Sequence, residues 1–169
     1  MGVERHFTVT GFVVHEDKTL LHWHRRLQMW MPPGGHIEPD EDPVTALLRE
    51  IGEETGVSAE VVPAPPRFSF DYPGQVAPPF TILLENSAEP GSAHGHVDLI
   101  YFCRPLDGDK LQPAAAAAVL VWVSEEQLRR QDTIPLASCG VDVPVAEDVR
   151  LLALEAIELV RQVSAGSKS

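Results

Sequence analysis

Residues 35–57 read GHIEPDEDPVTALLREIGEETGV and form the most informative run of the chain. Its apolar positions recur with helical spacing, directly after the Pro-Pro-Gly-Gly turn of residues 32–35. Asp42 can accept the first unpaired N–H groups as an N-cap, Pro43 suits the first helical position, and Gly56 suits a left-handed C-terminal turn. These features predict a helix that begins at Pro43 and ends before Gly56.

The predicted helix separates an apolar face from an acidic one. At about 100° per residue, Glu50, Glu53 and Glu54 project from one side, with Arg49 beside Glu53. The neighbouring arc carries the residues that can press into a core: Val44, Leu47, Leu48 and Ile51. Like-charged pairs at this spacing each cost about 0.2–0.5 kcal/mol, so the cluster indicates a bound cation. A hard divalent metal that takes oxygen ligands and accompanies a phosphate-bearing substrate fits the pattern.

The stretch resembles the signature of the Nudix hydrolases, which is a Gly, five residues, a Glu, seven residues, then Arg-Glu-aliphatic-x-Glu-Glu-x-Gly-aliphatic. Every specified position is filled: Gly35, Glu41, Arg49, Glu50, Ile51, Glu53, Glu54, Gly56 and Val57. At background frequencies of about 5–7% per residue type, a chance match is on the order of one in a billion per starting point. The alternative interpretation is an acidic amphipathic helix with a solvated face.

The resemblance implies a fold class and a reaction. The fold is α/β, a Nudix-type α/β/α sandwich with a mixed β-sheet. The reaction is hydrolysis of a phosphoanhydride bond in a nucleoside diphosphate linked to another moiety, by water attack on phosphorus with Mg²⁺ or Mn²⁺. Relatives imply that the metal ligands are Glu50, Glu53 and Glu54, with the carbonyl of Gly35 as a further one. Arg49 and Glu41 would form a salt bridge that orients these acids.

The general base stays open at this stage. Glu53 is the first choice, because a carboxylate beside the metal can take a proton from bound water. Many relatives instead use an acid from a later loop, and the candidates are Asp98, Asp107, Glu125 and Glu126. The Ala114–Ala118 run contains no acid and supplies none.

Substrate contacts are assigned from residue type alone. Arg26, next to Arg25, is the predicted phosphate contact, against a solvated strand end. A purine could stack on an aromatic face at Trp30, Phe68, Phe70 or Tyr72, with Trp30 and Phe70 preferred, although such residues also fit a core. The substrate subclass stays open among nucleoside triphosphates, nucleotide sugars such as ADP-ribose, and dinucleoside polyphosphates.

Composition restricts the partners. The 169 residues include 25 Asp and Glu against 13 Lys and Arg, a net charge of −12. This argues against a nucleic-acid groove or an anionic membrane surface, both of which need clustered cations. No signal peptide or membrane-spanning run stands out, so we expect a cytoplasmic protein whose partner is a small nucleotide, as a monomer or homodimer. Cys103 alternates with strand residues and is expected to be a buried free thiol, and with Cys139 it forms no disulfide framework.

Periodicity predicts strands alternating with helices, so the sheet is expected to be covered on both sides. Expected strands are 7–14, 19–24 (a hairpin turning near Glu16–Asp17), 57–62, 67–72, 80–85, 97–104 and 119–123, with loops at 30–35 and 86–95. A short helix with a Ser124–Gln127 capping box and a last helix over 146–163 follow. One domain over residues 1–164 and a frayed tail over 165–169 are expected.

Two groups of histidines raise the question of a second metal site. His22 and His24 share one strand face, and His94, His96 and Asp98 share another. A second, histidine-based metal site is conceivable, but structural or substrate-polar roles are the preferred interpretation because a metal needs convergent ligands. His36 occupies a variable place of the signature and is expected to be incidental.

Two other classes of protein stay in view. A nucleotide-binding sensor of the same family would bind without cleaving, but such regulators usually carry a DNA-binding extension, which this acidic chain is expected to lack. A related isoprenoid diphosphate isomerase would need catalytic Cys and Glu motifs that the chain does not match convincingly.

Overall fold

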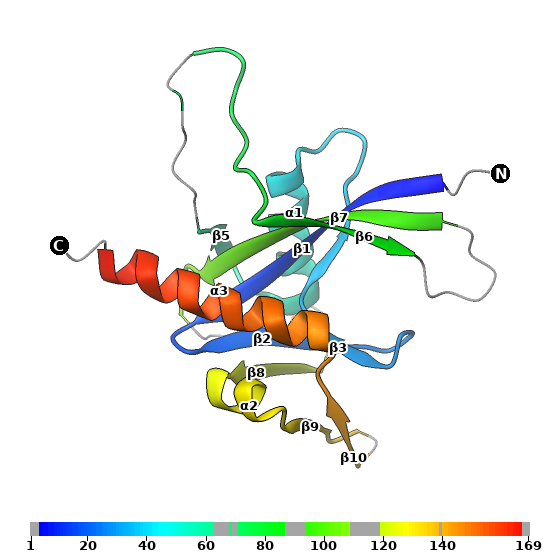
Figure 1. The fold of residues 1–169 in the computed structure, drawn as a ribbon. Helices are drawn as coiled ribbons and strands as arrows, with labels where there is room; N and C mark the ends of the chain where they lie inside the picture. Colours follow the sequence, from blue (N-terminus) through cyan, green and yellow to red (C-terminus); the bar gives the residue numbers. More distant parts are fainter. Residues whose placement is uncertain are drawn as a thin grey trace.

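The structure, a computed structural model, describes residues 4–62, 68, 71–86, 94–108, 119–138 and 140–166. Figure 1 shows its elements, which follow one another in this order: β1 (Glu4–His15), β2 (Lys18–His24), β3 (Met29–Met31), β4 (Gly34–His36), α1 (Pro43–Thr55), β5 (Ala59–Val61), β6 (Thr81–Asn86), β7 (His94–Pro105), β8 (Leu120–Ser124), α2 (Glu125–Arg130), β9 (Thr133–Leu136), β10 (Val141–Pro144) and α3 (Glu147–Gly166).

A mixed sheet of eight strands organises the molecule around β1. The order is β3-β2-β1-β7-β5, while β4 pairs with β1, β6 with β7 and β8 with β2. β1 and β7 run parallel, from Glu4 opposite His94 to Val13 opposite Cys103, and the other pairs are antiparallel. A parallel pair needs a long crossover, and the crossover between β1 and β7 includes α1.

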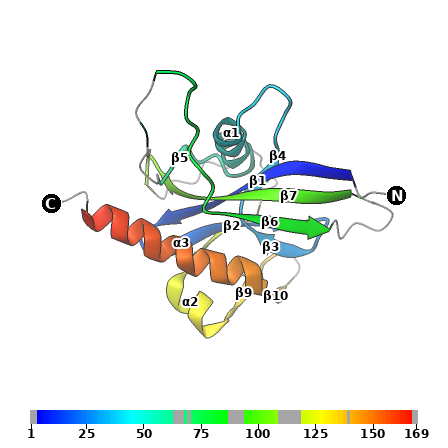
Figure 2. The ribbon, with the colours of Figure 1, turned by 45° about the horizontal axis from the view of Figure 1, so that its top comes forward.

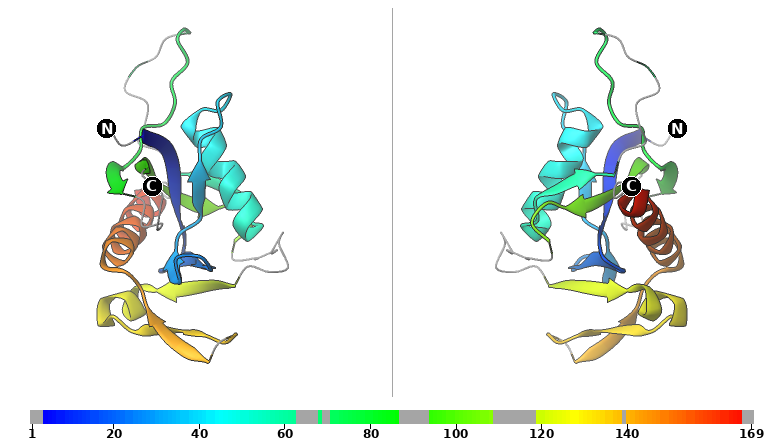
Figure 3. Two further views of the ribbon diagram at one scale, coloured as in Figure 1. Left: turned by 90° about the vertical axis from the view of Figure 1, so that its right-hand side faces the viewer. Right: turned by 90° about the vertical axis from the view of Figure 1, so that its left-hand side faces the viewer.

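Two helices cover opposite faces of this sheet, α1 on one side and α3 on the other (Figures 2 and 3). Side chains of β1 alternate between the two cores, with Val9 and Val13 toward α1 and Phe12 and Val14 toward α3. The predicted α/β/α sandwich with a mixed sheet is therefore confirmed.

Most predicted elements are found, because they carry strong local patterns. The first hairpin, the long strand β7 and the last helix lie where periodicity placed them. The Ser124–Gln127 capping box is present, with Gln127 N donating to Ser124 Oγ at 3.2 Å and Ser124 N donating to Gln127 Oε1 at 3.0 Å. Cys103 is a buried free thiol, and burial raises its pKa to about 12.

Other expectations were wrong. The expected loop over 30–35 holds the end of β3 and the start of β4, and β9 and β10 form a hairpin that was not predicted. These strands have three or four residues, too few for a periodic pattern to develop. Asn86, His94 and Gly95 belong to β6 and β7 rather than to a loop, and Ala165 and Gly166 extend α3.

The expected strand over 67–72 is absent from its described members, Phe68, Asp71 and Tyr72. The remaining residues of that strand, residues 87–93 of the expected loop, the alanine run, Cys139 and residues 167–169 lie outside the described residues. Within the described ranges, none of the helices has the length and hydropathy of a membrane span.

We expect Leu47→Ala to destabilise the fold by about 2–5 kcal/mol, because it opens a cavity where α1 meets the sheet. Leu47 is fully buried, whereas Leu151 on α3 is 52% exposed and provides a matched leucine. Urea denaturation should show a large fall in midpoint for Leu47→Ala and little change for Leu151→Ala. Equal midpoints for the two variants would contradict the packing of α1.

Candidate active site

The caps of α1 fix the helix that carries the acidic cluster. Asp42 Oδ1 accepts the N–H groups of Val44 at 2.9 Å and Thr45 at 3.1 Å, and hydrogen bonds to this carboxylate lower its pKa. Pro43 opens the helix, and Gly56 closes it at φ 71° while donating to the carbonyl of Gly52 at 2.9 Å. The predicted start, first position and end of this helix are confirmed.

Two glycines let β4 approach both β1 and α1 closely. A Cβ atom on Gly34 would stand 2.3 Å from the backbone oxygen of Val9, which is well inside contact distance. A Cβ atom on Gly35 would stand 2.3 Å from Glu50 Oε1, at the end of a flexible side chain. Gly34 is therefore required by backbone packing, whereas Gly35 leaves room for the Glu50 carboxylate.

Arg49 links the acids of the signature. Its Nε and Nη2 donate to the two carboxylate oxygens of Glu41 at 2.8 and 2.9 Å, a bidentate pair, so the predicted salt bridge is present. Nη1 donates to Glu50 Oε1 at 2.8 Å and reaches Glu53 Oε2 at 3.4 Å. Nη2 also donates to the carbonyl of His36 at 3.1 Å. The hydrogen bond from Arg49 lowers the pKa of Glu41, and the hydrogen bonds to Glu41 and Glu50 raise the pKa of the Arg49 guanidinium.

Glu54 is the most perturbed of the three acids. Its side chain is 29% exposed and accepts the N–H of Gly34 at 3.0 Å, with His22 Nε2 at 3.6 Å. Burial, with smaller contributions from Glu50 and Glu53, raises its pKa to about 7 against the effect of the Gly34 hydrogen bond. Burial and the nearby His24 lower the pKa of His22 to about 4. At neutral pH His22 is uncharged, so it provides no counter-charge for Glu54.

The donor set fits a hard divalent cation. Three carboxylates lie within one turn of α1, and the half-buried Glu54 has the Gly34 N–H and a neutral imidazole as described partners. Oxygen-only donors of this kind suit Mg²⁺ or Mn²⁺. In this structure the Glu50 carboxylate is turned toward Arg49 and accepts a hydrogen bond from it. Among the described residues, no three His, Cys, Asp or Glu side chains are arranged to share a metal ion.

A pocket of about 570 Å³ opens beside Glu54. Its wall comes from β1, β2, β3, β4, β6 and β7 and from the first turns of α3. The charged and titratable side chains that line it are His22, His24, Arg26, His36, Glu54, Glu85, His96, Asp98 and Asp148. The volume lies in the range of small-molecule sites.

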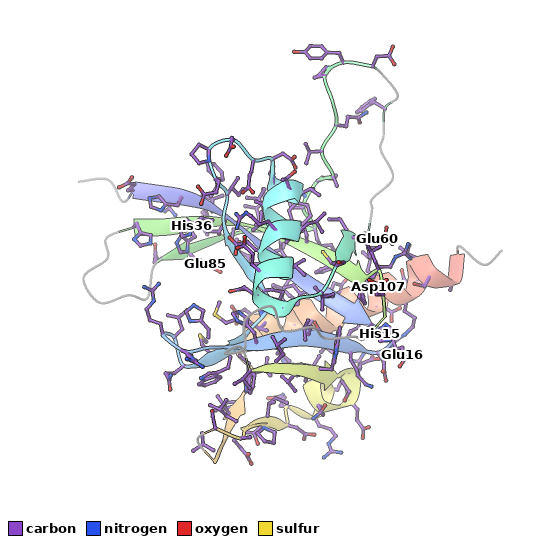
Figure 4. All side chains as sticks on the ribbon, turned by 180° about the vertical axis from the view of Figure 1, so that it is seen from behind. His15, Glu16, His36, Glu60, Glu85 and Asp107 are labelled. Carbon is purple, nitrogen blue, oxygen red and sulfur yellow. The ribbon has the colours of Figure 1, made fainter. Side chains whose placement is uncertain are left out.

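Asp98 is the one candidate base that lines this pocket. Its carboxylate accepts the hydroxyls of Thr8 and Thr10, each at 2.8 Å, and burial raises its pKa. Glu125 and Glu126 lie on α2, where they pair with arginines, and neither lines the pocket. Asp107 lies beyond the end of β7, near His15 and far from His36 and Glu85 (Figure 4).

Of the residues predicted to contact the substrate, some line the pocket and others do not. Arg26 lines the pocket. Trp30 is 1% exposed and meets Trp23 edge to face at 5.3 Å, so its prediction as a stacking platform is contradicted. Phe70 lies outside the described residues. Phe68 and Tyr72 are exposed but do not line the pocket.

Several pocket residues were missed by the sequence reasoning. Asp148, Val149 and Leu152 come from α3, and Glu85 comes from β6. The periodicity of α3 indicates its buried face, but does not indicate that its first turns reach the pocket. His22 was singled out, but its contact with Glu54 joins two segments that have no local pattern in common.

Comparison with known proteins agrees with this geometry. A model of the NUDIX domain matches residues 4–138, and the chain belongs to the NUDIX family. The crystal structure of a NUDIX-family hydrolase from Clostridium perfringens aligns with a TM-score of 0.73 at 27% identity, covering 94% of this chain and 99% of that one.

Curated relatives match shorter parts. A MutT-like protein of Streptomyces ambofaciens is 30% identical over 122 residues, 72% of this chain and 65% of the relative. An 8-oxo-dGTP diphosphatase of Haemophilus influenzae is 33% identical over 88 residues, 52% of this chain and 65% of the relative. The aligned parts therefore span less than two thirds of these relatives.

Alanine at the three glycines should separate packing from site geometry. Gly34→Ala should lower stability by about 2 kcal/mol or more, because its Cβ meets backbone. Gly35→Ala should cost less, since the Glu50 side chain can move away, and Gly52→Ala should add about 0.5–1 kcal/mol because Gly52 lies in α1 with open space around it. Thermal melts of the three variants test this order, and a Gly34→Ala protein as stable as Gly52→Ala would overturn it.

Metal-free Glu54→Gln should be more stable than wild type at pH 8. The pKa of Glu54 is higher in the folded protein than its value of 4.5 in the unfolded chain. The contribution of Glu54 to the free energy of unfolding is therefore intact below pH 4.5 and is lost as the pH rises toward about 7. With allowance for partial exposure, we expect a gain of about 1 kcal/mol, or about 2–4 °C, at pH 8 and little at pH 4.5.

Melting curves in EDTA at the two pH values measure this difference. His22 is present in both proteins, so its own titration largely cancels. Glu53→Gln is the control, because the Glu53 side chain is 62% exposed. A gain that is the same at both pH values, or equal in Glu53→Gln, would contradict the burial of the Glu54 charge.

Proposed function

We propose that this protein is a metal-dependent pyrophosphohydrolase. It cleaves a phosphoanhydride bond in a nucleoside diphosphate linked to another moiety, by water attack on phosphorus. The observation that carries the proposal is the position of the half-buried Glu54, which lines the pocket at the point where the complete acidic signature meets it. Relatives named 8-oxo-dGTP diphosphatase and RNA pyrophosphohydrolase support the reaction class.

The site residues divide the work between holding the metal and orienting its ligands. Glu50, Glu53 and Glu54 would hold Mg²⁺ or Mn²⁺, with the Gly35 carbonyl as a further donor. A metal held there would neutralise phosphate oxygens, lower the pKa of a bound water and help to align the attacking and leaving groups. Arg49 fixes the Glu50 carboxylate through its 2.8 Å hydrogen bond, and Glu41 in turn fixes Arg49.

Two residues in different parts of the site are candidates for the general base. Glu53 is our first choice as general base, because its carboxylate is 62% exposed and open to water. Asp98 is the second, since it faces the pocket with a raised pKa. Glu53→Gln and Asp98→Asn are compared at saturating metal, where loss of the base should remove the acid limb of the pH–rate profile and the other substitution should leave it.

The pocket suits the nucleotide part of the substrate. Its apolar side, from Phe12, Leu83, Ile100, Val149 and Leu152, can cover a base, while Arg26 offers a cation at the wall. We place the substrate among small nucleotides and the protein in the cytoplasm. Residues 1–164 form one domain in this proposal, because α3 packs on the same core as the sheet.

A hydrolysis screen tests the function directly. Nucleoside triphosphates, their oxidised forms, ADP-ribose, other nucleotide sugars and dinucleoside polyphosphates are incubated with Mg²⁺ or Mn²⁺. We expect one class to be cleaved strongly, with turnover reduced about 100-fold or more in Glu54→Gln. Glu126→Gln is the matched control, because Glu126 is 77% exposed on α2.

Two results would overturn parts of the proposal. A folded Glu54→Gln protein with near-normal turnover would remove Glu54 from the metal ligands. Tight nucleotide binding with no product from any substrate would favour the sensor class instead.

A further inference from the structure

Four histidines gather at one end of the sheet, outside the acidic cluster of α1. His6 comes from β1, His36 from β4, and His94 and His96 from β7. Their rings form a closed circuit with centroid separations of 5.1 Å (His6–His94), 5.1 Å (His94–His96), 5.2 Å (His96–His36) and 5.5 Å (His36–His6). We call this group the histidine quartet.

Strand register holds the quartet together. His6 is directly opposite His96 in the parallel pair of β1 and β7, and Thr8, two residues along β1, is opposite His36. Residues two apart on a strand point to the same face, so His6 and Thr8 share one face of β1. His96 and His36, which lie opposite them on the neighbouring strands, therefore lie on the same side of the sheet. His36 and His96 also line the pocket. Figure 4 shows His36 on the same side of the molecule as Glu85, away from His15.

We propose that the histidine quartet binds a divalent transition-metal ion of the zinc type. Imidazole nitrogen is a preferred donor for such ions and a poor one for Mg²⁺, so this site is distinct in chemistry from the carboxylates of α1. With Zn–N bonds of about 2.0–2.1 Å, two imidazoles at a tetrahedral angle place their centroids about 5 Å apart. The four measured separations match that spacing.

The environment of individual nitrogens supports the proposal. His96 Nε2 is buried and has no hydrogen-bond partner within the described residues, while His96 Nδ1 lies 3.9 Å from Glu85 Oε2. His6 Nε2 lies 3.5 Å from Glu4 Oε1, which leaves its other nitrogen for a metal. A carboxylate on the second ring nitrogen is the usual partner of a metal-bound histidine. A buried nitrogen without a partner is otherwise costly.

Binding requires rotation of the imidazole rings. The nitrogens do not converge on one point as they stand, and the rings of His6 and His94 are within 18° of parallel. The terminal torsion of histidine is broad, so such rotation is cheap. Burial and the neighbouring His36 and His94 lower the pKa of His96.

Calorimetric titration of Zn²⁺ into the whole chain, held in excess Mg²⁺ to occupy oxygen ligands, tests the site without reference to turnover. We expect one Zn²⁺ per chain in wild type, at least tenfold weaker binding in His94→Ala and in His36→Ala, and about tenfold weaker binding in Glu85→Gln. Co²⁺ in place of Zn²⁺ should give the strong visible bands of a tetrahedral nitrogen site in wild type and lose them in His94→Ala.

Two control variants distinguish Zn²⁺ binding at the quartet from Zn²⁺ binding elsewhere on the protein. His15→Ala changes a histidine at the opposite end of β1, near Trp122, and should leave Zn²⁺ binding unchanged. Glu54→Gln should also leave it unchanged. The proposal is overturned if wild type binds no Zn²⁺ under these conditions, if folded His94→Ala and His36→Ala retain full affinity, or if Glu54→Gln abolishes binding.

Discussion

The close approach of the Gly34–Gly35 backbone is the constraint on which the site depends. On one side it packs against β1 so tightly that a Cβ on Gly34 would stand 2.3 Å from the Val9 oxygen. On the other side Gly35 adjoins the Glu50 carboxylate, and the Gly34 N–H binds Glu54 at 3.0 Å. This part of β4 therefore positions two of the three acids relative to the sheet. Arg49, held by Glu41 and by the His36 carbonyl, completes this arrangement from the helix side.

Local patterns allowed the helix, its caps and its acidic face to be predicted, because each depends on residues within about four positions of one another. The burial of Trp30 depends instead on Trp23 across β2 and β3, and the pocket depends on α3 meeting β6. The histidine quartet joins His6 to His96 through a strand register that periodicity alone does not fix. Asp98 could be proposed from its residue type, but its two threonine partners come from β1, 90 and 88 positions earlier.

The carboxylates of the pocket wall repel a phosphate-bearing ligand. Glu54, Glu85, Asp98 and Asp148 all line the pocket, in a chain of net charge −12. At the low effective dielectric of a pocket, each carboxylate repels a phosphate by several times its strength in water. Burial relieves part of this repulsion, because it raises the pKa of Glu54, Glu85 and Asp98 and so favours their neutral forms. Besides Arg26, which also lines the pocket, bound cations would make such a wall attractive to an anion.

The parallel pairing of β1 with β7 has a consequence for how the protein is made. The two core surfaces of β1 face α1 and α3, yet β1 has no long partner until β7, about ninety residues later, has left the ribosome. The acidic helix is thus synthesised early, while the long strand that pairs with β1 beneath it arrives late. Loop closure over such a distance slows folding and leaves apolar strand surface open meanwhile. During that interval the nascent chain exposes apolar side chains of both faces of β1, among them Val9, Val13 and Phe12, and such transiently exposed surface favours aggregation.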